Sequence, residues 1–129
     1  MQRKSGAKKP LPLAIMTSDD THDKTLALLQ RSSYFGAKPQ QIHLIKQGRV
    51  PCFINPSGHL ALETHDPYAL QVKPHGHGDV HALMHSSGLA KRWLASGLQW
   101  VAFFQDTNSM VFRGLVPTLG APPRSLQEC

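Results

Sequence analysis

The feature that most constrains the fold is a pair of short apolar runs separated by a segment without Gly or Pro. The runs are residues 11–16 (Leu-Pro-Leu-Ala-Ile-Met) and residues 42–45 (Ile-His-Leu-Ile). Each has the length of a buried strand and is followed by polar or glycine residues that are typical of loops. Residues 21–34 carry leucines at helical spacing, and Asp19 or Asp20 precedes them as a helix cap. This strand–helix–strand pattern predicts an α/β fold with a parallel sheet.

The middle of the chain predicts a hairpin followed by a helix. In residues 50–62, two apolar runs flank Asn-Pro-Ser-Gly, a strong turn sequence, so we expect a hairpin inserted beside the sheet. Residues 73–79 contain two glycines and predict a loop. Residues 80–96 have an apolar stripe at helical spacing and predict one helix in spite of Gly88, with Gly97 as its end.

Residues 100–104 (Trp-Val-Ala-Phe-Phe) are continuously apolar, as central parallel strands are. A strand here would bring Asp106 to the carboxyl end of the sheet, where open α/β sheets bind ligands. A carboxylate at that place suits Mg²⁺ bridging phosphates. The alternative is that Asp106 caps a helix over residues 109–115, or that Asn108 caps it while Asp106 binds the metal.

Composition and charge limit the classes of function. With 129 residues, of which 40% are hydrophobic, the chain fits one small domain. The net charge is +6, but residues 1–18 hold four basic and no acidic residues, so most of the excess lies in a basic start, and we expect no binding to nucleic acid. Two cysteines and no apolar run of about 20 residues predict a cytoplasmic chain without a membrane span or a disulfide framework. We expect disorder in residues 1–10 and 121–129 and a folded region over residues 11–120.

The densest group of potential ligands is His75, His77, Asp79, His81 and His85. Histidines and a carboxylate at this spacing are typical of a metal site, since i, i+4 positions share one face of a helix. The alternative is that His81 and His85 are half-exposed helix residues. The glycines that flank His77 indicate a further function, because a loop without side chains before a helix lets backbone N–H groups approach a nucleotide or phosphate. Such loops also occur for purely structural reasons.

Three motifs carry a resemblance to a known family. They are residues 12–22 (Pro-Leu-Ala-Ile-Met-Thr-Ser-Asp-Asp-Thr-His), residues 73–81 (Lys-Pro-His-Gly-His-Gly-Asp-Val-His) and residues 103–108 (Phe-Phe-Gln-Asp-Thr-Asn). In this order they resemble the UDP-sugar pyrophosphorylases, which are UTP-monosaccharide-1-phosphate uridylyltransferases. The resemblance runs from residue 11 to residue 120. It implies a Rossmann-like, GT-A-like nucleotidyltransferase fold, mostly parallel in its sheet, with an inserted hairpin and incomplete in these 129 residues.

The resemblance also implies roles for individual residues. Met16 and Thr17 would border the uridine pocket, and Gln47 would contact the uracil ring. Gly76 would lie against the base, and His77 would reach the ribose-phosphate part of the nucleotide. The remaining position, Asp106, matches the Mg²⁺-binding aspartate of the family.

Two regions of the family pattern have no match in these residues, namely the glycine-rich triphosphate loop upstream of residue 11 and the sugar-binding half beyond residue 120. We therefore expect a fragment of a catalytic domain that forms UDP-sugar and pyrophosphate from UTP and a sugar 1-phosphate, and that is inactive by itself. The alternative is a non-catalytic remnant that acts as a binding or interaction module through a bare sheet edge. Missing neighbours would also favour non-specific self-association.

Overall fold

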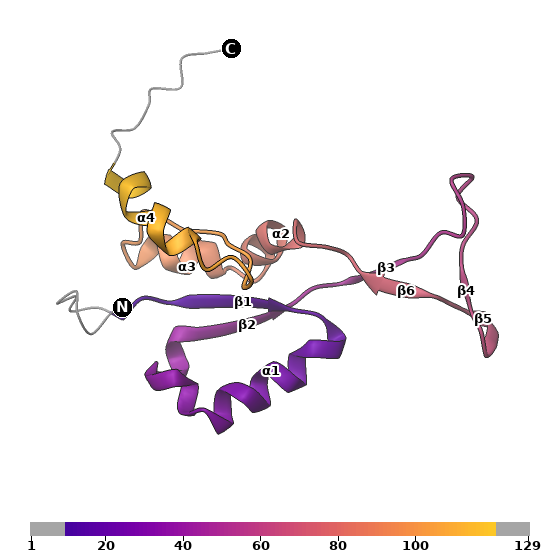
Figure 1. Cartoon of the computed structure of the whole chain (residues 1–129), viewed down its shortest axis with the longest axis horizontal. Coiled ribbons are helices and arrows are strands. Elements are labelled where there is room, and N and C mark those ends of the chain that lie inside the picture. Colours follow the sequence, from indigo (N-terminus) through magenta and orange to yellow (C-terminus); the bar gives the residue numbers. More distant parts are fainter. Residues whose placement is uncertain (1–9, 121–129) are drawn as a thin grey trace, which may run out of the picture. The chain divides into compact units, whose positions relative to one another are not determined.

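The structure is a computed structural model that describes residues 10–120 (Figure 1). It comprises two compact units, the first ending at Arg92 and the second beginning at Trp93. The expected tail and all of the expected basic start except Pro10 lie outside the described residues.

The first unit contains the predicted strand–helix–strand pattern. Strand β1 (Leu13–Thr17) leads into helix α1 (Asp19–Arg31), and strand β2 (Ile42–Lys46) follows. The two strands pair in parallel, with Leu13 opposite Ile42 and Thr17 opposite Lys46. Helix α1 packs against both strands, and Figure 1 shows it alongside the pair. The expectation of an α/β fold with a parallel sheet is thus confirmed for this pair of strands.

The predicted helix cap is wrong by one residue. Ser18 precedes α1 with an extended backbone, and its N–H donates a hydrogen bond of 3.0 Å to Thr21 Oγ1. Asp19 and Asp20 instead lie in the first turn of the helix. Serine is as good a cap as aspartate, and carboxylates are favourable near the unpaired N–H groups of the first turn.

Helix α1 ends at Arg31, three residues before the predicted end, because the next residues turn left-handed. A short 3-10 segment, η2 (Ser33–Gly36), has positive φ at all four residues, from 47° at Ser33 to 78° at Gly36. A second 3-10 segment, η3 (Pro39–Gln41), connects to β2. Such a run reverses the chain in a few residues and lets β2 lie parallel to β1.

An arm of short antiparallel strands occupies residues 49–74. At its base, β3 (Arg49–Pro51) pairs with β6 (Val72–Pro74), and further out β4 (Leu62–Glu63) pairs with β5 (Asp66–Leu70) (Figure 1). The predicted turn over residues 55–58 exists, with a bridge between Phe53 and Leu60. The predicted hairpin is thus formed in its central part, where Ile54 N–H donates to His59 O and Ala61 N–H donates to Cys52 O, each at 2.8 Å. Its flanking strands pair elsewhere, β3 with β6 and β4 with β5.

Three backbone hydrogen bonds form a ring where the segments of the arm meet. Cys52 N–H donates to Gln71 O, Gln71 N–H donates to Ala61 O, and Ala61 N–H donates to Cys52 O, each at 2.8 Å. Ala61 lies at this junction and is only 8% exposed. The ring therefore holds three chain segments together through main-chain hydrogen bonds.

The single helix predicted over residues 80–96 is two helices. Helix α2 (Asp79–Ser86) and helix α3 (Leu89–Ala95) are separated at Gly88, which has φ +68°. A residue in the left-handed region ends a helix, and glycine adopts that region without strain. Gly97 follows α3 with φ +87°, as expected for its end.

In the second unit, the predicted strand over residues 100–104 is absent; these residues are neither helix nor strand. A central parallel strand is defined by its ladder, and in residues 10–120 the sheets contain β1 to β6 only. Helix α4 (Val111–Gly120) follows, and the Phe104 and Phe112 rings meet edge to face at 5.2 Å.

The described residues have a thin core. Among the side chains whose burial the structure describes, only Leu29, Ala61, Met84 and Leu89 are buried apolar residues, and Thr17 is the buried polar one. Large apolar side chains on the arm are exposed, for example Ile54 at 68% and Tyr68 at 96%. Exposed apolar surface of this extent is typical of interaction sites and of aggregation-prone surface.

Candidate functional site

The carboxyl ends of β1 and β2 meet at one edge of the sheet because the strands are parallel. There the Gln47 N–H donates to the Thr17 carbonyl at 2.8 Å, and the Gln47 Oε1 accepts from the Gly76 N–H at 3.0 Å. A second link lies beside the first, since the His75 N–H donates to Gly48 O at 3.1 Å. Thr17, Gln47 and Gly76 are far apart in the sequence, and the structure brings them together.

Thr17 is fixed by its surroundings. The residue is 4% exposed, and its hydroxyl shares a hydrogen bond of 2.9 Å with His22 Nδ1 and donates a longer one of 3.4 Å to Ile45 O. His22 lies in the first turns of α1 and was not among the residues that the sequence singled out. The five-residue separation of Thr17 and His22 across a cap is the signal that could have indicated this contact.

The backbone of Gly76 has a conformation that other residues rarely adopt. Its φ is +128°, outside the range that L side chains adopt readily, and nothing lies within 4 Å of the position a Cβ would take. The loop therefore needs glycine for its conformation and leaves open space where the side chain would be. The two other predicted nucleotide residues lie nearby in the chain: Met16 is half-buried in β1, and His77 is exposed in the loop before α2.

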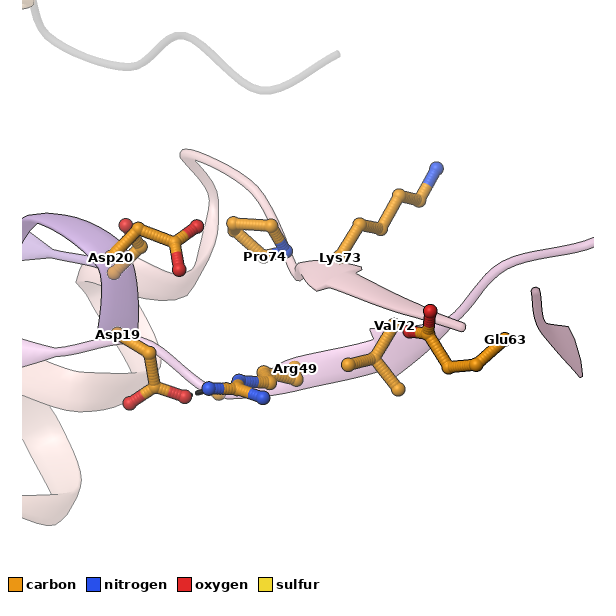
Figure 2. Close-up of a pocket in the computed structure, with 9 residues that line it drawn as sticks. Asp19, Asp20, Arg49, Glu63, Val72, Lys73 and Pro74 are labelled. Atoms are coloured by element: carbon orange, nitrogen blue, oxygen red, sulfur yellow. Dashed lines mark ion pairs between the residues drawn. The ribbon is translucent and has the colours of Figure 1, made fainter. Parts of the chain in front are cut away.

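A charged cluster lies directly beside this group. Asp19, at the start of α1, pairs with Lys46 Nζ at 2.7 Å and with Arg49 Nε. The hydrogen bond from Lys46 is the main cause that lowers the pKa of the Asp19 carboxyl below its ordinary value; Arg49 adds to it, and desolvation opposes it. Figure 2 shows the Asp19–Arg49 pair at the edge of a cavity of about 150 Å³, whose lining also includes Ser18, Asp20 and Lys73.

The histidine-rich metal site is not formed. In residues 10–120, no group of three or more His, Cys, Asp or Glu side chains is arranged to hold a metal ion. His75 instead pairs with Asp79, and His77, His81 and His85 are exposed. The metal interpretation of this cluster is therefore wrong for the described residues, because His77 lies in the loop before α2, off the helix face that carries His81 and His85, and Asp79 is paired with His75.

Asp106 lies in the second unit, in a turn over residues 106–107, and is exposed. Helix α4 begins only at Val111, so the interpretation of Asp106 as a helix cap is wrong. The backbone carbonyl of Asn108 accepts the N–H of Val111 at 3.4 Å. Chemically, one free carboxylate fits Mg²⁺, which proteins usually hold through one or two carboxylates together with substrate phosphates.

Comparison with known proteins gives a consistent family. The family model described as UTP–glucose-1-phosphate uridylyltransferase matches residues 2–110. The UDP-sugar pyrophosphorylase of Arabidopsis thaliana is 54% identical over 89% of this chain, and that of Oryza sativa subsp. indica is 51% identical over 85%. The UDP-N-acetylglucosamine diphosphorylase 2 of Arabidopsis thaliana is 34% identical over 75%.

Solved structures agree on the fold. A protein of Entamoeba histolytica assigned as a UDP-N-acetylglucosamine pyrophosphorylase aligns over 75% of this chain and 24% of its own, with a TM-score of 0.60 and 22% identity. The UDP-N-acetylglucosamine pyrophosphorylase of Trypanosoma brucei aligns over 62% of this chain and 15% of its own, with a TM-score of 0.51 and 30% identity.

The chain is short beside these relatives. It spans 19% of the length of the Arabidopsis UDP-sugar pyrophosphorylase and 18% of the Oryza protein. Within residues 10–120, none of the helices has the length and apolarity that crossing a membrane requires.

Proposed function

Since this chain belongs to the UTP–glucose-1-phosphate uridylyltransferase family, we propose that it forms the uridine-binding part of an enzyme that makes UDP-sugar and pyrophosphate from UTP and a sugar 1-phosphate. The observation that carries the proposal is the hydrogen-bonded group of Thr17, Gln47 and Gly76 at the carboxyl end of β1 and β2. Ligands of open α/β sheets bind at this edge.

The chemistry of the group suits a uracil ring. A glutamine amide offers both a donor and an acceptor, and the Gly76 N–H offers a second donor. Uracil presents carbonyl oxygens on either side of a ring N–H, so the two donors and the acceptor are complementary to it. In the free chain Gln47 and Gly76 satisfy each other, and the base would take over these bonds. Met16 would border the ring, and the exposed His77 would reach toward the ribose and phosphate.

The family membership of the chain suggests the reaction of the whole enzyme. The phosphate oxygen of the sugar 1-phosphate attacks the α-phosphorus of UTP in line with the leaving pyrophosphate. Such a transfer depends on positioning and charge neutralisation more than on a protein nucleophile. Asp106 would hold Mg²⁺, which neutralises charge on the phosphates when it is bound. The chain supplies the fixed base-binding edge, while the triphosphate loop and the sugar site belong to parts of the relatives that these 129 residues do not match.

Two further expectations belong to this proposal. The β1–β2 pair forms part of a larger, mostly parallel Rossmann-like sheet of the GT-A-like type, and the similarity in fold to the Entamoeba protein supports this. The chain acts in the cytoplasm, where nucleotide sugars are made from soluble substrates.

Titration of the full 129-residue chain with UTP tests the proposal. We expect saturable binding of UTP and of UDP-glucose, and weaker binding of CTP, because the cytosine amino group places a donor where uracil has an acceptor. Equal binding of UTP, CTP and ATP would contradict a uridine site. So would the absence of any binding in a sample that is folded by circular dichroism.

The second candidate function is an interaction module. Among the described residues, β1 and β2 pair only with each other, so each has an outer edge without a partner strand. Such edges accept a strand from another polypeptide. A chain that fails to bind UTP but is captured by a β-strand peptide at this edge would favour this function over the first.

A further inference from the structure

Gln47 lies in a loop of two residues, Gln47 and Gly48, between β2 and β3. The last residue of β2 is Lys46, and the first residue of β3 is Arg49. Both of these flanking residues form ion pairs with one carboxylate, that of Asp19. A single side chain on α1 is therefore attached to the chain on each side of Gln47.

We propose that Asp19 is a positioning residue, which sets the place of Gln47 at the nucleotide base by binding Lys46 and Arg49 together. This inference rests on the proposed role of Gln47 in binding uracil. No part of it requires that Asp19 touch the nucleotide.

The attachment reaches Gly76 as well. Arg49 is opposite Pro74 in the β3–β6 pair, and the chain continues from Pro74 to Gly76 in two residues. The His75 N–H donates to Gly48 O at 3.1 Å, which ties the glycine loop to the loop of Gln47. Through Arg49, Asp19 thus also fixes the base of the arm from which Gly76 emerges.

The geometry of Asp19 makes this role specific. Its side chain is 29% exposed, while those of Lys46 and Arg49 are 51% and 53% exposed, so the carboxylate is the most enclosed member of the cluster. Its two oxygens are used separately, Oδ1 by Lys46 and Oδ2 by Arg49. A carboxylate that bridges two cations holds them in a definite relation, which an isolated surface pair does not.

The chain offers a matched control. Asp20 is the next residue, carries the same charge, lies in the same first turn of α1 and lines the same cavity, but its carboxylate forms no ion pair with a described residue. In Figure 2 the dashed line joins Asp19 to Arg49, and none reaches Asp20. Asp19→Asn and Asp20→Asn therefore change the net charge equally, and of the two only Asp19→Asn removes the bridge.

The first measurement needs no nucleotide. In ¹⁵N spectra of the full chain, Asp19→Asn should displace the side-chain amide signals of Gln47 and the backbone signal of Gly76, and Asp20→Asn should leave both in place. Asp19→Glu, which keeps the charge, should restore them in part. Equal displacement by Asp19→Asn and Asp20→Asn, or none by either, would overturn the proposal.

The second measurement is the UTP affinity of the same variants. We expect Asp19→Asn to raise the Kd roughly tenfold, the loss that corresponds to one misplaced hydrogen bond to the base, with Asp20→Asn unchanged. If the wild-type chain binds no UTP while the Gln47 signals respond to Asp19 as described, the proposed function fails and the positioning role stands. If UTP binds and Asp19→Asn has the affinity and spectrum of Asp20→Asn, the positioning role fails and the function stands.

Should Asp19→Asn not fold, the partner variants keep the proposal testable. Lys46→Gln and Arg49→Gln each remove one half of the bridge and leave α1 intact. Each should displace the Gln47 amide signals in the same direction. Unchanged signals in both variants would overturn the proposal.

Discussion

Replacing Gln47 by leucine tests the candidate site most directly. Leucine has nearly the volume of glutamine but neither donates nor accepts a hydrogen bond. The substitution removes the acceptor of the Gly76 N–H, a bond of 3.0 Å in a partly buried place, and with it the amide that would face uracil. A hydrogen bond contributes about 1 kcal/mol to stability, so the melting temperature should fall by only a few degrees, about 5 °C for a domain of this size.

The effect on nucleotide binding should be larger than the effect on folding. Loss of one or two hydrogen bonds to the base costs about 1–2 kcal/mol, which raises the Kd for UTP roughly 5- to 30-fold. Gln47→Glu keeps an acceptor for Gly76 but loses the donor of the amide, so it should preserve stability and still bind UTP weakly. Isothermal titration of the full chain measures both variants.

Gln40→Leu is the control for these variants. Gln40 is exposed in η3 and has no hydrogen bond to a described residue, so its replacement should leave the Kd and the melting temperature unchanged. A Kd for Gln47→Leu within twofold of wild type, in a chain that binds UTP, would refute the assignment of Gln47 to the base.

Four further outcomes are expected. The 129-residue chain should form no measurable UDP-glucose from UTP and glucose 1-phosphate, whereas the Arabidopsis relative carrying these residues in place of its own should be active; turnover by the chain alone would contradict this. In that hybrid, Asp106→Asn should lower activity by orders of magnitude without loss of folding, and near-normal turnover would exclude the metal role. The chain alone should associate at micromolar concentrations in size-exclusion chromatography, because apolar residues such as Ile54 are exposed; a monomer with a sharp melting transition above about 60 °C would count against it. Because the pKa of Asp19 is lowered by folding, its stabilising contribution is complete above the ordinary carboxyl pKa and is lost as the pH falls through the lowered value, so between about pH 5 and pH 2 the melting temperature of Asp19→Asn should fall less steeply than that of Asp20→Asn.

Local patterns were sufficient to predict the part of the fold whose elements follow one another directly along the chain, namely β1, α1 and β2. The apolar runs at β1 and β2 and the glycine-free segment between them predict the parallel pair, and the carboxyl ends of these strands bring Thr17 and Gln47 together. No local pattern predicts the hydrogen bond between Gly76 and Gln47; the family resemblance implied only that both residues lie at the base.

Prediction failed where pairing depends on distant partners. Residues 100–104 are as apolar as a central strand, but strand structure requires a neighbouring strand, and none pairs with them in residues 10–120. In the arm, the hairpin around residues 55–58 was found, whereas β5 and β6 were not predicted as strands, so the pairing of β3 with β6 and of β4 with β5 was missed. The bridge by Asp19 was missed since a helix-capping pattern and an ion-pairing carboxylate look alike in sequence.

The hydrogen bonds that join Cys52, Ala61 and Gln71 involve main-chain atoms only, so they do not depend on which side chains these positions carry. The sequence of most of the arm can therefore vary, and the hairpins that turn at residues 55–58 and 64–65 can lengthen, without changing how the three segments join. Ala61, enclosed at the junction, is constrained in size. The turns at residues 55–58 and 64–65 are therefore two places where an insertion should leave the base of the arm, and the loop of Gly76 that follows it, unchanged.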